Sequence, residues 1–600
     1  MLYIVDYDGM KPMTSIWKEL IISITPGMAI IGALGSSPFA DRWGRRPVII
    51  ASAVLFAIGG VVCGAATEKI CLLVGRILLG IAIGIASMII PIYIGEAAPS
   101  YIRGSLITTF QVMIAFGQVI ANFVAGVFSY ANPVYTGWRF MLGLASVPGI
   151  IQLIGFFFLP ESPRFLFYKN RKDEAEKACR ISEAVTKEVM KFSVGLAHCP
   201  LAPAAHTELQ PVSRHFDFIR ESSRQQVLER VYSGSKEWIA YEMSEIKDAY
   251  EEEMKAKAKV GDSPVLWRMI TTPHVLKALM IGCAIQLFQQ LSGVNTIMYY
   301  TGQIIQSAGV KDKHLTIWIS LGISTANVLG TLIPLTLVER FGRRVLLLIS
   351  VGMTFVTLVL MGVAFLLINK DSPDAIPLTV INGTHHYLKN CIEMSNCDLC
   401  VTNDHCGFCH IGTEKDPGYC LPLNLEDTTD VSALGPCSYG YNTSAFTFVH
   451  SFCVTRYTVM PIILMVVYLG FFSMGFAPLT WVLNAEFYPL WARGVGCSLS
   501  TSFNWIGDLI IALTFLTLSQ AVTKYGAFFI YAGFTLIAFV FIFFLVPETK
   551  GLPIEEVELL FMPKKSRRRT RSVLRAQEAL KLRNIKKDTV APMSTISTVS

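Results

Sequence analysis

Long apolar runs recur along this chain, and they constrain its fold more strongly than any other feature. A run of about 20 apolar residues is long enough to cross the ~30 Å hydrocarbon core of a bilayer. Because lipid offers no partner to backbone amides, each run must form a helix. Charged residues make up only 16% of the chain, whereas soluble proteins average about 25%. We therefore predict an all-α membrane protein with about eleven spans, at 20–40, 48–66, 72–94, 107–129, 139–159, 275–300, 315–338, 346–368, 457–485, 495–521 and 526–546.

The chain also repeats itself. Three motifs recur: DRWGRRP (41–47) as ERFGRRV (339–345), EAAPSYIRG (96–104) as EFYPLWARG (486–494), and PESPR (160–164) as PETKG (547–551). The first pair is 298 residues apart, and the other two are 390 and 387 apart. The difference matches the length of the loop 369–455, which we interpret as an insertion into the second of two similar halves. Parallel halves of this kind are a transporter architecture.

The repeat predicts where the chain divides and shows one span without a counterpart. In the second half the span 275–300 precedes the span that ends at GRR, but in the first half Met1 lies too close for an equivalent span. We therefore expect the first span to be missing and the sequence to be incomplete or truncated. The predicted segments are an N-terminal transporter half (1–166), a cytoplasmic loop with an insertion (167–273), the first part of the C-terminal half (274–368), an extracellular Cys-rich loop (369–455), the last three spans (456–551) and a basic cytoplasmic tail (552–600).

Basic loops indicate which face is cytoplasmic. The two GRR loops, the loop 167–273 and the tail that starts KKSRRRTR after Pro563 are all basic. Lys and Arg concentrate in cytoplasmic loops, and a basic tail suits the anionic cytoplasmic leaflet. The loop 369–455 is then outside, and both N-x-S/T sequons lie in it, at Asn382 and Asn442. Since such sequons are glycosylated on the extracellular side, we expect a plasma-membrane glycoprotein with a cytoplasmic C-terminus.

Eight of the fourteen cysteines lie in the loop 369–455. C-x2-C occurs twice, which makes zinc an alternative, but only five residues separate the two pairs, where zinc ribbons have about 15–20. An even number of cysteines on an oxidising face favours disulfides, which stabilise a loop with little core. We predict a disulfide-rich module without a metal, its pairing open among about 105 connectivities. The cysteines are Cys391, Cys397, Cys400, Cys406, Cys409, Cys420, Cys437 and Cys453.

Several motifs together resemble one transporter family. GRILLGIAIGIASMIIPIYIGEAAPSYIRG, PESPRFL, QLFQQLSGVNTIMYY, VERFGRR and VPETKG are similar to motifs of the sugar porter family of the Major Facilitator Superfamily, from about Trp17 to Phe561. The Cys-rich loop, NAEFYPLWARG and FNWIGD resemble the proton/myo-inositol cotransporters within that family. The resemblance implies two six-helix halves that rock around a central site, with a proton as coupling ion and no cofactor.

Three glutamines in the span 275–300 are candidate substrate ligands. Gln286, Gln289 and Gln290 lie at i, i+3 and i+4 and share one helix face. Because amides facing lipid are costly, this face is expected to line a cavity or to bond another helix. An amide offers donors and an acceptor to the hydroxyls of a polyol. The resemblance favours binding and assigns substrate contacts to these glutamines and to Asn295, Gln111, Asn327, Trp481 and Asn504, although packing is the ordinary role of a lone Trp.

Two charged residues inside predicted spans are candidates for proton coupling. Asp508 lies four residues after Asn504, on the same face of an apolar span, and an intramembrane acid is a functional hypothesis by default. The family often has an amide at this position, so polar packing is the alternative. Arg76 corresponds to the arginine that pairs, in proton-coupled members, with an acid of the first span. Tyr299 and Tyr300 could gate the outer side or pack in the core.

Charged residues at the predicted cytoplasmic ends of the spans form a candidate gate. Paired charges there can hold the halves together while the inner gate is shut. The alternative is that they only anchor the spans in the membrane. The candidates are Asp41, Arg45, Arg46, Glu96, Arg103, Arg164, Glu339, Arg343, Arg344, Glu486 and Arg493.

The sequence therefore predicts a secondary transporter that moves a cyclic polyol, myo-inositol, with protons. A passive hexose facilitator of the same fold is one alternative. A non-transporting receptor that binds an extracellular protein through the Cys-rich loop is another. No nucleophile–base constellation or nucleotide-binding loop supports an enzyme, and the basic balance is explained by the membrane rather than by nucleic acid.

Overall fold

The computed structural model describes most of the predicted transporter core. The described residues are 15–97, 103–169, 264–307, 312–377, 388–403, 405–412, 416–424, 431–438, 446–449, 455–457, 459–489, 491–550 and 557–563, with short pieces at 7, 10, 171, 173–175, 177–178, 310, 453 and 552. The sequons at Asn382 and Asn442 lie outside them.

The first half is a bundle of helices. Arg45–Ala65 and Ser146–Phe158 pack on one another, and both Ser15–Trp43 and Arg45–Ala65 pack on Lys69–Ala97. The elements are α1 (Ser15–Trp43), α2 (Arg45–Ala65), α3 (Lys69–Ala97), α4 (Arg103–Phe128), the π-helical turn η3 (Pro133–Gly137), α5 (Trp138–Gly143), α6 (Ser146–Phe158) and the short α7 (Pro163–Tyr168).

The second half has a similar arrangement with two interrupted helices. A break after Leu291 separates two helices, and a residue with a positive φ of 68°, Thr523, separates the last two spans inside one long helix. The elements are α11 (Val265–Thr271), α12 (Pro273–Leu291), α13 (Val294–Ser307), α14 (Lys313–Phe341), α15 (Arg343–Asp371), α18 (Met460–Phe471), the π-helical turn η4 (Phe472–Phe476), α19 (Ala477–Glu486), α20 (Arg493–Leu545) and the 3-10 turn η5 (Glu558–Phe561).

The helical spans lie where the apolar runs predicted them. Among the described residues, 10 helical stretches are long and apolar enough to cross a membrane. The remaining predicted span, 495–521, is also helical and forms the first part of α20. The prediction of an all-α, multi-span membrane protein is therefore confirmed.

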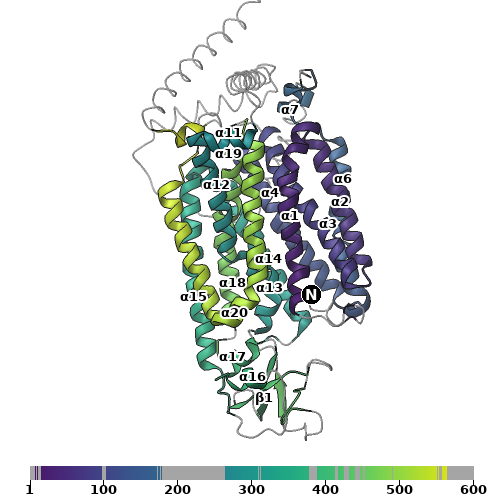
Figure 1. The fold of residues 1–600 in the computed structure, drawn as a ribbon, viewed down its shortest axis with the longest axis vertical. Helices are drawn as coiled ribbons and strands as arrows, with labels where there is room; N and C mark the ends of the chain where they lie inside the picture. The colour runs from purple at the N-terminus through teal and green to yellow at the C-terminus, as the bar shows by residue number, and fades with distance from the viewer. Residues whose placement is uncertain are drawn as a thin grey trace, which may run out of the picture.

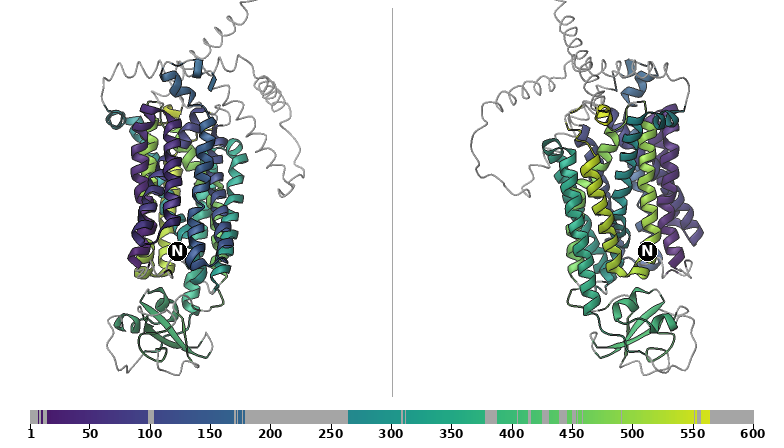
Figure 2. Two further views of the ribbon diagram at one scale, coloured as in Figure 1. Left: turned by 90° about the vertical axis from the view of Figure 1, so that its right-hand side faces the viewer. Right: turned by 60° about the vertical axis from the view of Figure 1, so that its left-hand side comes forward.

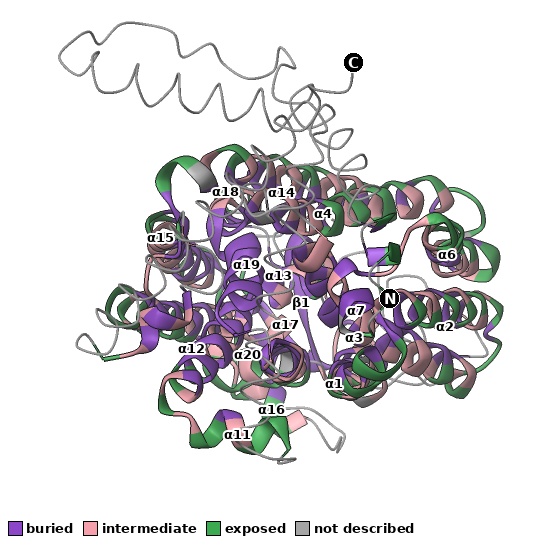
Figure 3. Cartoon of the chain, turned by 90° about the horizontal axis from the view of Figure 1, so that it is seen from above, coloured by how far each residue is buried: buried purple, intermediate pink, exposed green. Residues whose placement is uncertain are grey.

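The two halves lie side by side and meet along two seams. Seen from above, α1, α2, α3 and α6 lie on one side, and α12, α15, α18 and α19 on the other (Figure 3). The seams are formed by α1 with α20 and by α4 with α14. Large apolar side chains cover the outside of the bundle, among them Phe158 and Phe544, which are 83% and 75% exposed. Such a surface suits lipid rather than water.

The Arg-rich junctions and the Cys-rich module lie at opposite ends of the bundle. α7, α11 and the α14–α15 junction lie at one end, whereas α15 ends next to the module at the other (Figures 1 and 2). The predicted orientation, with the Arg-rich loops on one side of a membrane and the Cys-rich loop on the other, requires the two regions to lie at opposite ends.

The Cys-rich module is a small sheet with two short helices held by disulfides. Its strands β1 (Cys406–Ile411), β2 (Gly418–Pro422) and β3 (Phe446–Val449) pair antiparallel in the order β2-β1-β3, beside α16 (Leu388–Ile392) and α17 (Cys397–Thr402). All eight predicted cysteines are paired, as Cys391–Cys406, Cys397–Cys453, Cys400–Cys420 and Cys409–Cys437. The prediction of a disulfide-rich module is confirmed.

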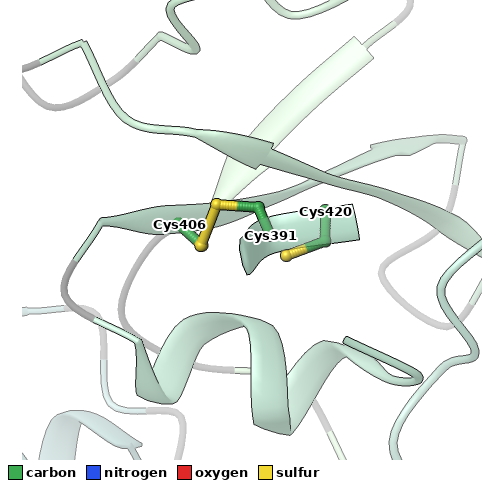
Figure 4. A group of neighbouring side chains, drawn as sticks. All are labelled: Cys391, Cys406 and Cys420. Atoms are coloured by element: carbon green, nitrogen blue, oxygen red, sulfur yellow. A yellow bond between two sulfur atoms is a disulfide. The ribbon is translucent and has the colours of Figure 1, made fainter. Parts of the chain in front are cut away.

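Three of these cysteines lie close enough together to resemble a metal site. The sulfur atoms of Cys391, Cys406 and Cys420 all lie within 4.8 Å of one another (Figure 4). Cys391 and Cys406 are bonded to each other, and Cys420 is bonded to Cys400. Their sulfurs are therefore not thiolates, the form that a metal would require.

The module is attached to the second half by a buried ion pair. Lys524, in the turn between the last two spans, lies 3.1 Å from the Asp398 carboxylate of α17. Asn369 of α15 donates to the same carboxylate at 3.2 Å, and Asn396 donates to the Asn369 carbonyl at 3.1 Å. These contacts join the module to the ends of two spans.

We expect Asp398→Asn to loosen the module from the spans, because it leaves the Lys524 ammonium largely buried without its counter-charge. The expected loss of stability is about 1–3 kcal/mol. Thermal unfolding and the rate of proteolytic cleavage within the module measure it. Asp371→Asn is the matched control, since Asp371 accepts a bond from the backbone of Arg456 at an exposed position. Equal cleavage rates for both variants would contradict the expectation.

Candidate functional site

A cluster of buried amides joins α12 to α20. Asn504 donates to the side-chain oxygens of Gln286 and Gln289 at 2.7 and 2.8 Å. Gln290 donates to the Asn504 side-chain oxygen at 2.8 Å and accepts from Asn295 at 2.7 Å. All three glutamines and Asn504 are buried. Five of the eight predicted substrate ligands are therefore brought together by one polar cluster.

The glutamines also bond the backbone of the helices that face them. Gln289 donates to the carbonyls of Phe476 and Ala477 at 2.9 and 3.1 Å, and Gln286 donates to the Thr480 carbonyl at 3.5 Å. Both alternatives raised from the sequence, helix–helix bonding and hydroxyl binding, use these same groups. The contacts present are those between helices, and the amides have the donors and acceptors that polyol hydroxyls would need.

The cluster lies next to a break between α12 and α13. Gly293, with φ +82°, follows the end of α12, and its hydrogen bond to the Gln290 carbonyl, 2.9 Å, closes the turn. A Cβ at this position would approach the ring of Tyr531 to 2.6 Å, so both backbone conformation and space favour glycine. The break allows Asn295 to follow the glutamines directly at the start of α13.

A second polar group connects the two halves between α4 and α14. Asn327 donates to Gln118 at 2.9 Å and accepts a bond from the Ser473 hydroxyl. Gln118 in turn donates to the Met298 sulfur of α13 at 3.4 Å. Sequence reasoning missed Gln118, although it lies seven residues after Gln111, on the same face of a helix.

Gln111 and Trp481 lie apart from these polar groups. Gln111 is half-buried on α4 and has no hydrogen-bond partner among the described residues. Trp481 is buried and packs edge-on against Phe110, with ring centres 5.8 Å apart, in a cluster with Ile107 that joins α19 to α4. The contact found for Trp481 is aromatic packing between the halves.

A buried carboxylate lies on the same helix as Asn504. Tyr299 of α13 donates to Asp508 Oδ2 at 2.8 Å. Asp508 is 1% exposed, and its Oδ1 has no hydrogen-bond partner among the described residues. Arg76 is half-buried on α3, and its Nε likewise lacks a partner there. A buried polar atom without a partner is costly. Asp508 Oδ1 is a candidate to receive a proton, and Arg76 Nε–H is a candidate to donate to a ligand.

A charge cluster lies at the α1–α2 junction of the first half. The Arg45 guanidinium contacts Glu96 at 3.0 Å and Asp41 at 3.6 Å. The other Glu96 oxygen accepts from the Ser162 hydroxyl at 2.5 Å. Glu161 accepts the backbone N–H groups of Arg45 and Arg46, at 3.0 and 3.1 Å. The Glu161 carboxylate therefore satisfies two backbone N–H groups at the start of α2 that have no partner within the helix.

The second half repeats the Arg–Glu pair, the hydroxyl bond and the capping glutamate of this cluster. Arg343 contacts Glu486 at 3.3 Å, and the other Glu486 oxygen accepts from the Thr549 hydroxyl at 2.7 Å. Glu548 accepts the backbone N–H groups of Arg343 and Arg344 at 2.9 and 3.0 Å. Both Arg–Glu pairs join residues of the same half. The glycines before α2 and α15, Gly44 and Gly342, have φ of 105° and 92°, which opens the turn for the carboxylate.

The helix-capping glutamates were missed from the sequence. Glu161 and Glu548 are the glutamates of PESPR and PETKG, so the repeat itself was the available signal. Burial raises the pKa of the Glu161 carboxyl above its ordinary value, although the N–H donors of Ser162, Arg45 and Arg46 oppose this. The backbone bonds thus offset only part of the cost of burying this charge.

The remaining gate candidates are less completely described. Arg46 and Arg344 donate to backbone carbonyls of Phe157 and Phe543, at 2.7 and 2.5 Å. Buried Arg493 donates to the Tyr488 carbonyl at 3.5 Å. Arg164 lies near enough to Glu96 to interact electrostatically. The side chains of Arg103 and Glu339 lie outside the described part of the structure.

Comparison with known proteins identifies similar transporters. The profile described as sugar (and other) transporter matches residues 5–197, 216–388 and 434–561. The proton myo-inositol cotransporter hmit-1.1 of Caenorhabditis elegans is 47% identical over 579 residues, covering 95% of this chain and 87% of the relative. The proton myo-inositol cotransporter of Homo sapiens is 36% identical over 553 residues, covering 92% and 76%.

Solved structures share the fold. The Major Facilitator Superfamily proton:xylose symporter XylE, bound to 6-bromo-6-deoxy-D-glucose, matches with a TM-score of 0.62 at 19% identity, covering 93% of this chain and 92% of that one. A partially occluded inward-open form of XylE from E. coli matches with a TM-score of 0.56 at 18% identity. At this identity the likeness concerns the architecture of the two halves, which agrees with the predicted fold class.

Proposed function

Because the chain belongs to the sugar (and other) transporter family, we propose that it moves myo-inositol across a membrane together with protons. Family membership makes it a membrane transporter rather than an enzyme. The observation that carries the proposal is the identity of 47% and 36%, over more than nine-tenths of this chain, to proteins named proton myo-inositol cotransporters. The proton is the coupling ion, and the transport cycle requires no cofactor.

The amide cluster is the proposed substrate site. A cyclic polyol presents hydroxyls around its whole ring, and each can donate and accept one hydrogen bond. Gln286, Gln289, Gln290, Asn295 and Asn504 offer matching groups at the break between α12 and α13. Asn327, with Gln118, would contact the substrate from the seam between α4 and α14. Gln111 and Trp481 complete the proposed set from the other part of that seam.

A substrate can bind to this cluster by replacing hydrogen bonds that the amides already make, and unpaired donors are not required. The amides now bond each other and backbone carbonyls at 2.7–3.5 Å. A hydroxyl that replaces one of these partners restores the lost bond, so the exchange has a small net cost. Release of the helix–helix bonds would then link substrate binding to movement of α12 and α20.

The charge clusters are proposed to keep each half rigid and to close the inner gate. Each cluster ties a helix–helix junction of its own half through one Arg–Glu pair and one capping glutamate. The halves approach one another at this end, where a Cβ on Gly494 would lie 3.2 Å from the Ser37 hydroxyl and 3.6 Å from the Asp41 carboxylate. Rocking of two rigid halves, the movement proposed for alternating access, would open this contact.

Asp508 is the proposed proton carrier, and Arg76 is the second residue proposed to take part in proton coupling. A carboxylate that is buried inside the helical bundle, with one oxygen unpartnered, can take up a proton from the aqueous path. Intramembrane acids of this kind typically mark proton relays.

The proposed location is the plasma membrane. The arginines at the α1–α2 and α14–α15 junctions and the basic C-terminal tail favour a cytoplasmic position for that end of the bundle. The disulfide module, 369–455, would then be extracellular and carry glycans on Asn382 and Asn442. The segment boundaries given above from the sequence remain the proposed division of the chain.

Uptake of labelled myo-inositol and labelled glucose into proteoliposomes tests the function. We expect myo-inositol uptake that increases when the outside is acidified and is lost when a protonophore collapses the gradient. Glucose uptake insensitive to pH would instead support a hexose facilitator. If neither compound is transported by folded protein, the chain is not a transporter of this class, and a receptor role for the disulfide module becomes the leading alternative.

A further inference from the structure

The Tyr299–Asp508 hydrogen bond links the short helix α13 to the buried carboxylate. Tyr299 Oη donates to Asp508 Oδ2 at 2.8 Å, and Asp508 Oδ1 has no partner among the described residues. One carboxylate oxygen therefore holds α13 through Tyr299. Asn295, at the start of the same helix, also interacts with this carboxylate.

α13 contacts both halves of the molecule. It is separated from α12 by the break at Gly293, where φ is +82°. Its Met298 accepts from Gln118 of the first half at 3.4 Å, while the neighbouring Tyr299 bonds α20 of the second half. A short helix after a glycine break can change its angle more easily than a continuous span, so α13 is suited to act as a gate.

Tyr299 is accessible, whereas the carboxylate that it bonds is not. Tyr299 is 41% exposed and Asp508 is 1% exposed. The hydrogen bond therefore joins an accessible side chain of α13 to a buried acid of α20.

The charged and titratable neighbours of this pair come from three elements. Tyr300 lies next to Tyr299 on α13. Arg76 of α3 acts on Tyr299 from the first half, and Glu19 of α1 acts on Tyr300. Tyr299 is the titratable group that bonds the Asp508 carboxylate directly.

Resting on the proposed proton coupling, we propose that Tyr299 is a positioning residue that ties α13 to Asp508 and releases it when Asp508 binds a proton. A hydrogen bond to a carboxylate is roughly twice as strong as one to a neutral acceptor. A proton that arrives on Oδ1 leaves Oδ2 as the carbonyl oxygen of a neutral acid, which accepts the Tyr299 bond more weakly. Proton binding would thus loosen the gate helix.

Tyr299→Phe tests this by removing the hydroxyl and keeping the ring. Transport is measured in proteoliposomes as the ratio of myo-inositol uptake at acidic and neutral pH, and as counterflow at one fixed pH. We expect the acid-stimulated component to fall about tenfold, the effect of losing one hydrogen bond to a charged group. Counterflow, which needs binding and movement but no net proton transfer, is expected to persist.

Tyr300→Phe is the matched control. Tyr300 donates to the Ala512 carbonyl at 3.1 Å, so this variant removes a bond between the same two helices without touching the carboxylate. We expect it to keep the acid stimulation. The inference is overturned if Tyr299→Phe keeps the wild-type pH ratio, or if Tyr300→Phe loses as much as Tyr299→Phe. A wild-type protein that transports without any pH dependence would instead overturn the proposed proton coupling, and the inference with it.

A double variant gives a second, independent measurement. If Tyr299 acts through Asp508, Tyr299→Phe combined with Asp508→Asn should show the same pH ratio as Asp508→Asn alone, because groups that act as a unit are not additive. A further loss in the double variant would contradict the positioning role.

Discussion

Glu486→Gln is expected to lower the free energy of unfolding by about 3–5 kcal/mol, the cost of removing one charge of a buried ion pair. The Arg343 side chain is 6% exposed, and that of Glu486 is 9% exposed. Glutamine has nearly the same shape and can still accept the Thr549 hydroxyl, so the change removes the charge and little else. Thermal unfolding in detergent and the amount of folded protein at the cell surface measure the effect.

Two further variants separate the ion pair from general damage at this end of the bundle. Glu558→Gln is the surface control, because the Glu558–His274 contact of 2.7 Å is partly exposed and should contribute at most about 1 kcal/mol. Arg343→Met combined with Glu486→Gln removes both charges and should recover part of the stability lost by Glu486→Gln alone. A double variant that is less stable than the sum of the single variants would contradict a favourable pair.

The equivalent pair in the first half should contribute less. Arg45 contacts Glu96 at 3.0 Å, but its side chain is 15% exposed, against 6% for Arg343. If the Glu96 charge is removed, water can therefore solvate part of the Arg45 guanidinium and reduce the loss of stability. The two halves share the same arrangement of residues, and they differ in how far each pair is shielded from solvent.

The spans could be predicted well because the hydrophobicity of a segment depends only on its own residues and not on what it contacts in the fold. The boundary between the last two spans was placed between 521 and 526, and the helix breaks at Thr523, where φ is 68°. Polar residues in a long apolar run are costly in lipid, so a break there can be inferred without knowledge of the fold.

The helix-capping role of Glu161 and Glu548 could not be inferred in the same way. Their partners are backbone N–H groups about 115 and 205 residues away in the chain, and a backbone donor leaves no signature in the sequence. The same limit applies to the disulfides, because Cys397 pairs with Cys453 across 56 residues and the choice among pairings depends on the folded sheet. In both cases the missing information was which segments meet in space.

The shared helix face of Asn504 and Asp508 was predicted correctly, but their partners diverge. Asn504 bonds the glutamines of α12, whereas Asp508, one turn further, bonds Tyr299 of α13. Asn295 of α13 interacts with both groups, because it donates to Gln290 and lies next to the Asp508 carboxylate. The break at Gly293 causes this difference, since it directs α12 and α13 to successive turns of α20. The ligand cluster and the proposed proton carrier are therefore neighbours on one helix, which favours coupling between them.

Asp508→Asn is expected to abolish acid-stimulated uptake of myo-inositol. Asparagine has nearly the same shape and its oxygen can still accept the Tyr299 bond, but it cannot take up a proton in this pH range. Uptake that increases with acidity in the wild type should become flat with pH in the variant, while counterflow at fixed pH persists. Uptake of labelled myo-inositol across a series of external pH values measures this.

Asp312→Asn is the control for loss of a carboxylate, because Asp312 caps α14 by accepting the His314 N–H at 2.9 Å and asparagine caps helices equally well. It should keep the wild-type pH profile. If Asp508→Asn also keeps that profile, Asp508 does not carry the proton, and its carboxylate serves only to hold α13 through Tyr299. If both pH dependence and counterflow are lost from folded protein, Asp508 is needed for substrate movement itself. The amide cluster and the carboxylate would then act as one binding site rather than as two coupled ones.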